Sequence, residues 1–297
     1  MFKKIVEDIK ALKIQGAENI AKASIKAVND IFLKNKDSTD VELLMQLKLA
    51  KQTLISTRPT EPALRNSLNF LFSDINENNL KINLKRNIEK ATSHFLNSDR
   101  EIAKIGANKI KNGMKIYTHC HSNTVISIFK EAIKQKKKFT VLNTETRPKY
   151  QGRITAEDLS KLGIKVTHYP DNAARIAIRQ ADMVLFGSDA VTSEGDVINK
   201  IGSGMFSEIA NRYDVPVYCC TNSWKFDPKS IQGFDEEIEE RNPKEVWEKP
   251  PKGIKIKNIA FEKIEATNIS GIISELGIYN PNTFINEIRR FYPWMFK

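Results

Sequence analysis

Apolar side chains follow a helical period through the first part of the chain. Over residues 1–110 they recur three or four positions apart, as at Ile5 and Ile9, which is typical of helices that bury one face. Two prolines within residues 57–62 interrupt the pattern, because the interior of a helix does not accommodate them. Residues 80–110 predict one long helix or two helices in series. No comparable strand pattern appears, so we predict that residues 1–110 are helical.

The pattern changes after the Asn-Gly turn at residues 112–113, where short apolar runs begin to alternate with helical segments. The predicted strands are residues 114–118, 139–142, 164–168, 183–186 and 215–220, and the predicted helices between them are residues 124–135, 156–162, 173–179 and 202–213. Alternating strands and helices imply right-handed crossovers and a parallel sheet. The predicted fold is therefore α/β, with a helical N-terminal domain (residues 1–110) followed by a Rossmann-like doubly wound parallel sheet domain (residues 111–297).

The last part of the chain has a different character. Residues 226–262 are rich in charge and proline and predict a long connection. We expect helical segments after it, at residues 269–275 and 281–290.

Composition narrows the class of protein. The chain has 297 residues, of which 40% are hydrophobic and 28% charged, as in ordinary soluble globular proteins. Its first residues are amphipathic rather than continuously apolar, and no apolar stretch is long enough to cross a bilayer. Its three cysteines, two of them adjacent, form neither a disulfide framework nor spaced metal ligands. We expect a reduced, cytoplasmic protein with no structural metal and no membrane partner.

The formal net charge of +11 has two interpretations. A basic protein can bind nucleic acid, or it can attract an anionic substrate such as a phosphate. The lysines are spread along the chain rather than gathered in one stripe, and no RNA-binding signature is present. The phosphate interpretation is therefore favoured, and nucleic acid is not an expected partner.

Residues 117–124 contain a lone thiol between a predicted strand and a predicted helix. Cys120 follows the first strand at its carboxyl end, which is where open α/β sheets bind ligands. We predict that the helix dipole and nearby cations lower the pKa of this thiol and make a thiolate available for proton transfer. The alternative is that Cys120 is an inert, buried small side chain.

The loops after the other strands share the same edge of a parallel sheet. Asp189 comes three residues after the apolar strand at residues 183–186. Partial burial there is expected to raise the pKa of its carboxyl group, which suits a general acid. The alternative is a structural carboxylate that caps a backbone turn.

Three further loops offer polar and cationic groups. Asn199 and Lys200 precede a predicted helix start and could orient hydroxyls and hold phosphate, or they could be a turn amide beside a surface lysine. Lys225 lies between two aromatic residues and is either a phosphate ligand or a stem packed on them. Arg147 and Arg153 are expected to serve a salt-bridged structural loop.

Taken together, these loops resemble those of one protein family. The matching sequences are Thr-His-Cys at residues 118–120, Glu-Thr-Arg-Pro-Lys-Tyr-Gln-Gly at 145–152, Asp189 with Glu-Gly at 194–195, Val-Ile-Asn-Lys-Ile-Gly at 197–202 and Trp-Lys-Phe-Asp-Pro at 224–228. They are similar to the superfamily of translation initiation factor 2B α, β and δ subunits and its metabolic relatives, ribose-1,5-bisphosphate isomerase and methylthioribose-1-phosphate isomerase. The resemblance covers nearly the whole chain and looks closest to archaeal ribose-1,5-bisphosphate isomerase.

The resemblance implies a catalytic pair. In the isomerases of this superfamily the pair is a Cys in the Thr-His-Cys motif and an Asp in a Gly-x-Asp motif, and the regulatory subunits generally lack it. Cys120 and Asp189 match these positions. The family's substrate contacts would map to Gln15, Gly16, Ala17, Glu18, Arg58, Ser122, Asn123, Thr124, Asn199, Lys200 and Lys225.

Two segments depart from the family pattern. Residues 15–18 read Gln-Gly-Ala-Glu where the family has Arg-Gly-Ala-Gly, so a cation is lost and a carboxylate gained where phosphate is expected. Residues 121–123 read His-Ser-Asn where the isomerases commonly have Asn-Ser-Lys or Asn-Ser-Gln. These changes bear on the identity of the substrate more than on the catalytic pair.

The resemblance therefore implies an aldose–ketose isomerase that converts ribose 1,5-bisphosphate to ribulose 1,5-bisphosphate without a metal or redox cofactor. It also implies a homo-oligomer, either a dimer or a hexamer built as a trimer of dimers, and AMP as an activator. Two alternatives stay open: a non-catalytic, initiation-factor-like regulatory subunit, and an isomerase of another pentose 1-phosphate such as methylthioribose 1-phosphate.

Overall fold

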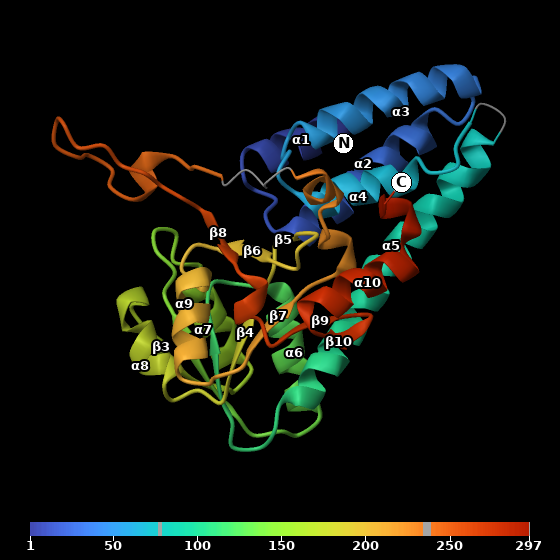
Figure 1. Ribbon diagram of the computed structural model, residues 1–297. Helices are drawn as coiled ribbons and strands as arrows, with labels where there is room; N and C mark the ends of the chain where they lie inside the picture. Colours follow the sequence, from blue (N-terminus) through green and yellow to red (C-terminus); the bar gives the residue numbers. More distant parts are fainter. Residues whose placement is uncertain (77–78, 234–238, 297) are drawn as a thin grey trace.

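The computed structural model describes residues 1–76, 79–233 and 239–296. The first part is helical, as predicted, with α1 (Phe2–Lys10), α2 (Ala17–Lys34), α3 (Asp40–Ile55), α4 (Pro62–Leu71) and α5 (Leu80–Lys109). Helix α3 begins with a capping box between Thr39 and Glu42, and α4 begins at Pro62, where a missing N–H costs nothing. The break at residues 57–62 is confirmed, and residues 80–109 form a single helix (Figure 1).

A seven-stranded sheet follows the helices. Its strands are β1 (Lys115–Thr118), β2 (Thr140–Thr144), β3 (Lys165–Tyr169), β4 (Met183–Phe186), β7 (Val217–Cys220), β9 (Gly271–Ser274) and β10 (Gly277–Tyr279), in the order β10-β9-β7-β4-β1-β2-β3. All neighbouring pairs are parallel except β9 and β10. The five strands predicted from the sequence are confirmed to within one or two residues at each end.

The helices cover both faces of this sheet. The crossover helices are α6 (Asn123–Lys134), α7 (Gln151–Lys161), α8 (Ala174–Ile178) and α9 (Ser203–Arg212). Alternate strand residues enter two hydrophobic clusters: Met183 and Leu185 pack with α5, α6 and α7, whereas Val184 and Phe186 pack with α8, α9 and the N-terminal helices. Because residues of the N-terminal helices and of the sheet share a cluster, the boundary near residue 110 stays a prediction.

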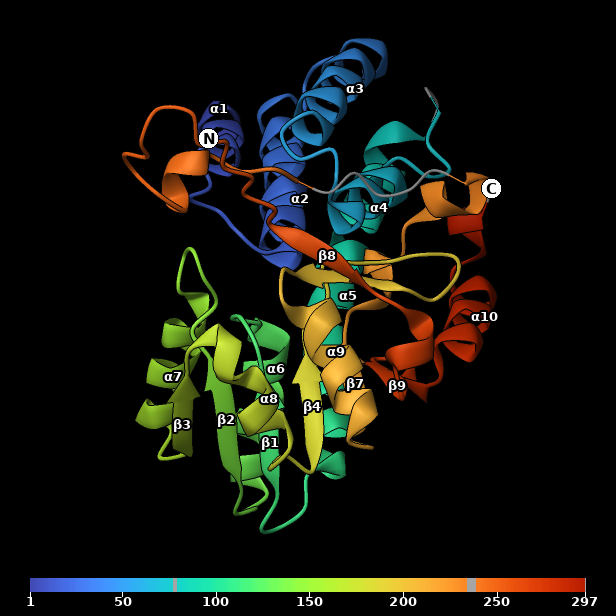
Figure 2. The same ribbon diagram turned by 60° about the vertical axis from the view of Figure 1, so that its left-hand side comes forward.

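A second, smaller sheet lies between the N-terminal helices and the carboxyl ends of the parallel strands (Figure 2). It has three antiparallel strands, β5 (Ala190–Val191), β6 (Val197–Lys200) and β8 (Phe261–Ile264), in the order β5-β6-β8. The sequence pattern did not indicate this sheet. Its importance is positional, because the β5–β6 hairpin carries residues from the loop after β4 over the edge of the main sheet.

The C-terminal region corrects one prediction. Residues 269–275 were expected to be helical, but they contain β9, whose four residues are all buried beside β7. A short apolar run does not distinguish a buried strand from a buried helix. Here the run forms a strand because it pairs with the edge of β7. The helix expected at residues 281–290 is confirmed as α10 (Pro281–Phe291), with Asn280 as its N-cap.

The long connection predicted at residues 226–262 is also confirmed in the described residues. It contains the short 3-10 turns η3 (Pro228–Gln232) and η4 (Pro243–Glu245), and the part around η4 projects from the body of the molecule (Figure 1). In the described parts of the chain, no helix is both long enough and apolar enough to cross a membrane.

The start of α7 sets the path of the loop after β2. A Cβ atom added at Gly152 would lie 1.7 Å from the carbonyl oxygen of Thr144, so only glycine permits this close approach of two backbone segments. The carbonyl of Gly152 also accepts a hydrogen bond from Asn143 Nδ2 at 2.7 Å.

We therefore expect Gly152→Ala to lower the free energy of unfolding by about 1–3 kcal/mol, because backbone must move to relieve the clash. Urea denaturation would measure this. The exposed Ser160→Ala on the same helix is the control, with a change within about 0.5 kcal/mol. A Gly152→Ala protein as stable as this control would contradict the close-packing argument.

Candidate active site

A cavity of about 460 Å³ lies between the loops at the carboxyl ends of the strands and the N-terminal helices, and its volume is that of a small-molecule site. Its lining includes every site residue predicted from the sequence: Gln15, Gly16, Ala17, Glu18, Arg58, Cys120, Ser122, Asn123, Thr124, Asp189, Asn199, Lys200 and Lys225. Residues from distant parts of the chain therefore meet in one place, although their roles stay predictions.

Cys120 occupies the turn between β1 and α6 in a left-handed backbone conformation, with φ of 65°. A residue with a side chain is strained in this region, and such strain is common at functional sites. Two threonines hold the turn: Cys120 N–H donates to Thr146 Oγ1 at 2.9 Å, and Thr155 Oγ1 donates to the Cys120 carbonyl at 2.7 Å. Ser122 then caps α6 by accepting from Val125 N–H.

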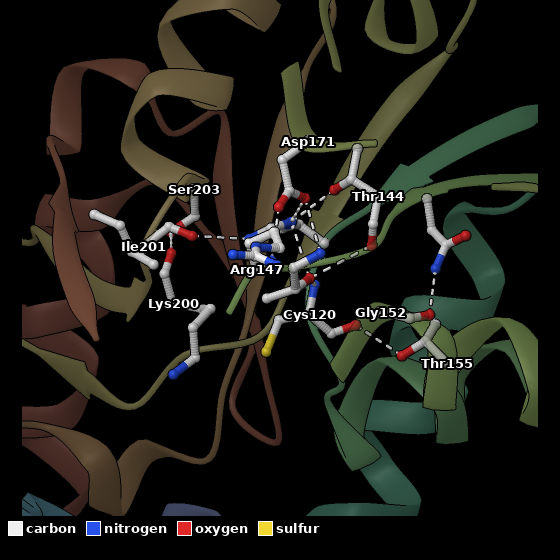
Figure 3. Close-up of polar contacts among 12 residues, drawn as sticks. Cys120, Thr144, Arg147, Gly152, Thr155, Asp171, Lys200, Ile201 and Ser203 are labelled. Carbon is white, nitrogen blue, oxygen red and sulfur yellow. Dashed lines mark hydrogen bonds and ion pairs between the residues drawn. The ribbon is translucent and has the colours of Figure 1, made fainter. Parts of the chain in front are cut away.

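A hydrogen-bond network behind the turn positions Thr146 (Figure 3). Asp171 accepts hydrogen bonds from the backbone N–H groups of Thr146 and Arg147 at 2.8 and 2.7 Å. His119 Nε2 lies 2.9 Å from the carbonyl of Ile201, which can only accept, so Nε2 carries the proton and Nδ1 accepts from Thr144 Oγ1 at 2.7 Å. Burial lowers the pKa of His119 to about 4, so the imidazole is neutral.

The prediction for the Cys120 thiol is wrong in direction. Burial raises its pKa to about 11, and the positive charge of Lys200, which lies beside it in Figure 3, opposes this only in part. At neutral pH Cys120 is therefore a thiol rather than a thiolate. Cys120 is nevertheless half-buried and lines the cavity, whereas Cys219 and Cys220 are fully buried in the core.

Asp189 lies between β4 and β5 and is half-buried. Its backbone N–H donates to the carbonyl of Ile198 at 2.9 Å, which fixes it at the start of the hairpin. No residue in the described ranges donates a hydrogen bond to its carboxylate. The alternative that Asp189 only caps a turn is therefore not supported, and its carboxylate is available to a ligand.

Asn199 and Lys200 precede the start of a helix, as predicted, since α9 begins at Ser203. The strand β6 that carries both residues was not predicted. Both are buried, at 5% and 8% exposure, so the alternative of a turn amide beside a surface lysine is wrong. The Lys200 ammonium lies 4.1 Å from the centroid of the Phe261 ring, and burial lowers the pKa of Lys200. Asn199 Nδ2 has no hydrogen-bond partner among the described residues.

The remaining predicted cations have mixed outcomes. Lys225 is buried, lines the cavity and donates from Nζ to the carbonyl of Ser188 at 2.5 Å, so it is more than a stem packed on aromatic rings. Arg153 forms a salt bridge with Glu145 at 3.0 Å, as expected of a structural loop. Arg147 instead donates to Tyr150 and to the carbonyl of Val246.

A lysine on helix α2, Lys22, places a positive charge beside Glu18 of the loop at residues 15–18. Lys22, one helical turn after Glu18, approaches the Glu18 carboxylate at 2.5 Å and that of Asp99 at 3.0 Å. Burial raises the pKa of Glu18, and the charge of Lys22 lowers it. Glu18, Lys22 and Asp99 all line the cavity, so Lys22 supplies a positive charge to the part of the cavity that residues 15–18 line.

Four charged residues of the cavity were missed as site residues: Lys22, Glu61, Asp99 and Arg241. Lys22 was detectable, because it lies four residues after Glu18 on a predicted helix. Glu61 and Arg241 gave no signal, since both belong to irregular segments whose burial depends on what packs over them. Among the described residues no group of His, Cys, Asp and Glu side chains is arranged to hold a metal ion.

Comparison with known proteins agrees with this geometry. A family profile described as the initiation factor 2 subunit family matches residues 13–281. The chain belongs to this family.

Within the family the chain is similar to enzymes. It is 40% identical to the ribose 1,5-bisphosphate isomerase of Methanocaldococcus jannaschii, over 100% of this chain and 97% of that protein. It is 32% identical to the methylthioribose-1-phosphate isomerase of Thermotoga petrophila, over 93% of this chain and 86% of that protein. Its fold matches the crystal structure of translation initiation factor eIF-2B from Pyrococcus horikoshii with a TM-score of 0.84 at 27% identity, covering 96% of this chain and 98% of that one.

The raised pKa of Cys120 predicts how its reactivity depends on pH. Because the thiolate is the nucleophile, the rate of alkylation by iodoacetamide should rise about tenfold per pH unit between pH 7 and about pH 9.5, without a plateau. Lys200→Met should react more slowly at each pH, since it removes the charge that stabilises the thiolate. Cys120→Ser gives the background from the buried cysteines. A plateau below pH 8 would show that the thiolate is already formed.

Proposed function

We propose that this protein is an aldose–ketose isomerase that converts ribose 1,5-bisphosphate to ribulose 1,5-bisphosphate. The observation that carries the proposal is the convergence of Cys120, Asp189 and the cations Arg58, Lys200 and Lys225 on one cavity. The similarity to ribose 1,5-bisphosphate isomerases over the whole chain supports it.

The chemistry of the substrate explains why an acid and a base are both needed. The phosphate on the anomeric oxygen blocks the free aldehyde, so the ring must open during the reaction. In the reacting state Cys120 has passed its thiol proton to the Asp189 carboxylate. Asp189 donates this proton to the ring oxygen as the bond from that oxygen to C1 breaks, and the Cys120 thiolate removes the proton from C2, whose electron pair forms the C1–C2 double bond. Loss of the 2-hydroxyl proton and proton return at C1 then give the ketose. A positioned acid or base contributes roughly a hundred- to ten-thousandfold.

The cavity divides the other tasks among its polar groups. Arg58, Lys200 and Lys225 hold phosphate, and Asn199, with an amide nitrogen free of described partners, binds a sugar oxygen. Lys200 also stabilises the thiolate of Cys120 when it forms. No step requires a metal or redox cofactor. Assembly as a homo-oligomer, activation by AMP and a cytoplasmic location belong to the same proposal.

Two alternatives remain in view. The similarity to methylthioribose-1-phosphate isomerase favours a monophosphate substrate, and the match to a translation initiation factor favours a binding role without catalysis. Against the second stands the half-buried Asp189 carboxylate, which serves no structural hydrogen bond among the described residues. Against the first stands the number of cations, since Lys22, Arg58, Lys200, Lys225 and Arg241 all line the cavity.

Incubation with ribose 1,5-bisphosphate and detection of the ketose product tests the function. We expect turnover by the wild type, and a fall of at least about a hundredfold in Asp189→Asn and Cys120→Ser. Asp189→Asn should still bind the substrate in calorimetry, because asparagine keeps the shape of the side chain. Asp37→Asn, at an exposed turn, is the control and should be fully active. An active Asp189→Asn protein would refute the mechanism and favour the regulatory alternative.

The cation assignments predict a separate kinetic effect. Lys225→Met and Arg58→Met should each raise KM by about tenfold or more and change kcat less, because a phosphate contact is present in both the ground state and the transition state. The exposed Lys252→Met should change neither constant. Unchanged KM in both cavity variants would remove Arg58 and Lys225 from the phosphate site.

A further inference from the structure

Glu61 is a buried acid that the proposed mechanism does not use. It immediately precedes α4, is 4% exposed and lines the cavity. Its Oε1 accepts a hydrogen bond from Arg58 Nη2 at 2.9 Å, whereas its Oε2 is buried and has no hydrogen-bond partner in the described parts of the chain. A buried carboxylate oxygen without a partner is costly, and protonation removes much of that cost.

The charges around Glu61 come from four segments. Arg58 lies on the same loop as Glu61, and Lys225 lies on the 3-10 turn η2 (Ser223–Lys225). Asp189 lies at the start of the β5–β6 hairpin, and Glu239 lies in the long connection. Burial raises the pKa of Glu61 most, the negative charges of Asp189 and Glu239 raise it further, and Arg58 and Lys225 oppose them. The resulting pKa is about 7, so Glu61 changes its charge close to neutral pH.

Arg58 is shared between two carboxylates. Its Nη2 atom lies 2.9 Å from Glu61 and 2.9 Å from Glu239, and Glu239 also contacts Arg241 at 3.2 Å. A phosphate that binds Arg58 therefore approaches a cation whose charge is already balanced. The dianion adds negative charge close to Glu61, which must raise the pKa of Glu61 still further.

We propose that Glu61 is a proton-linked phosphate-binding residue, which takes up one proton when the dianion of a phosphate monoester binds at Arg58. In its neutral form Glu61 frees the positive charge of Arg58 for the phosphate and no longer repels it. The inference rests on the proposed function, because it takes the phosphate from the sugar-phosphate ligand.

The linkage fixes the sign of the pH dependence. Below about pH 7 Glu61 is already protonated and affinity is unaffected, whereas above it each unit of pH weakens binding by up to about tenfold. Glu61→Gln mimics the protonated form and should lose this dependence. At pH 8 it should bind about tenfold more tightly than the wild type, and at pH 6 equally. A merely structural role predicts the opposite, since loss of the Arg58–Glu61 ion pair would weaken binding at both pH values.

Calorimetric titration with ribulose 1,5-bisphosphate, in two buffers of different ionisation enthalpy, measures affinity and proton uptake together. At pH 8 the wild type should take up close to one proton more than Glu61→Gln. Protons taken up by the ligand phosphates or by other residues are largely common to both proteins and cancel in the difference. Glu157→Gln, on the exposed face of α7, is the matched control and should behave as the wild type. Circular dichroism melting checks that the variants are folded.

Two results would overturn the inference in different ways. Equal proton uptake by the wild type and Glu61→Gln, or weaker binding by Glu61→Gln at pH 8, would refute the role of Glu61 and leave the isomerase proposal intact. Absence of proton uptake by the wild type at pH 8 refutes it without any variant. Failure of the wild type to bind ribulose 1,5-bisphosphate at pH 6 and pH 8 would overturn the proposed function and this inference with it.

Discussion

The left-handed turn at Cys120 depends on two threonine hydroxyls supplied by the neighbouring loop and helix. Thr146 accepts from the Cys120 N–H and Thr155 donates to its carbonyl, so both ends of a strained residue are held. The threonines are positioned in turn by Asp171 and by the close approach of Gly152 to β2. The direction of the thiol into the cavity is therefore a property of three consecutive strand ends and not of one loop.

A second constraint is the concentration of charge in a poorly solvated space. Acids and bases alternate around the cavity: Glu18 with Lys22, Glu61 with Arg58, and Asp189 near Lys200 and Cys120. Burial pushes Glu18, Glu61 and Cys120 toward their neutral forms, and the neighbouring cations oppose this. The raised pKa values of Cys120 and Glu61 follow from the balance. Such a site responds to an incoming anion by moving protons, because the charge cannot be screened by water.

Local pattern was sufficient to place the catalytic candidates and insufficient to describe their surroundings. Cys120 and Asp189 follow strands whose apolar runs are plain, so their position at the sheet edge could be predicted. The strand that carries Asn199 and Lys200 could not be predicted, because β6 forms through pairing with β8, which begins only at Phe261. The pKa of Glu61 depends on its burial and on the charges of Asp189, Lys225 and Glu239, which come from distant parts of the chain and leave no signal in the local pattern. The helix prediction for residues 269–275 was wrong for the same reason, because these residues pair with the edge of β7 and form β9.

The three-stranded sheet β5-β6-β8 makes assembly of the cavity depend on the order in which the chain is synthesised. Strand β6, which carries Lys200, has β5 on one side and β8 on the other, and β8 begins only at Phe261. Domains generally fold from the N-terminus as they emerge during synthesis. A nascent chain that has exposed Arg58, Cys120 and Asp189 still lacks the outer strand that holds Lys200 over the thiol. The chemistry of the cavity therefore becomes available only after residues 261–264 have been made and have paired with β6.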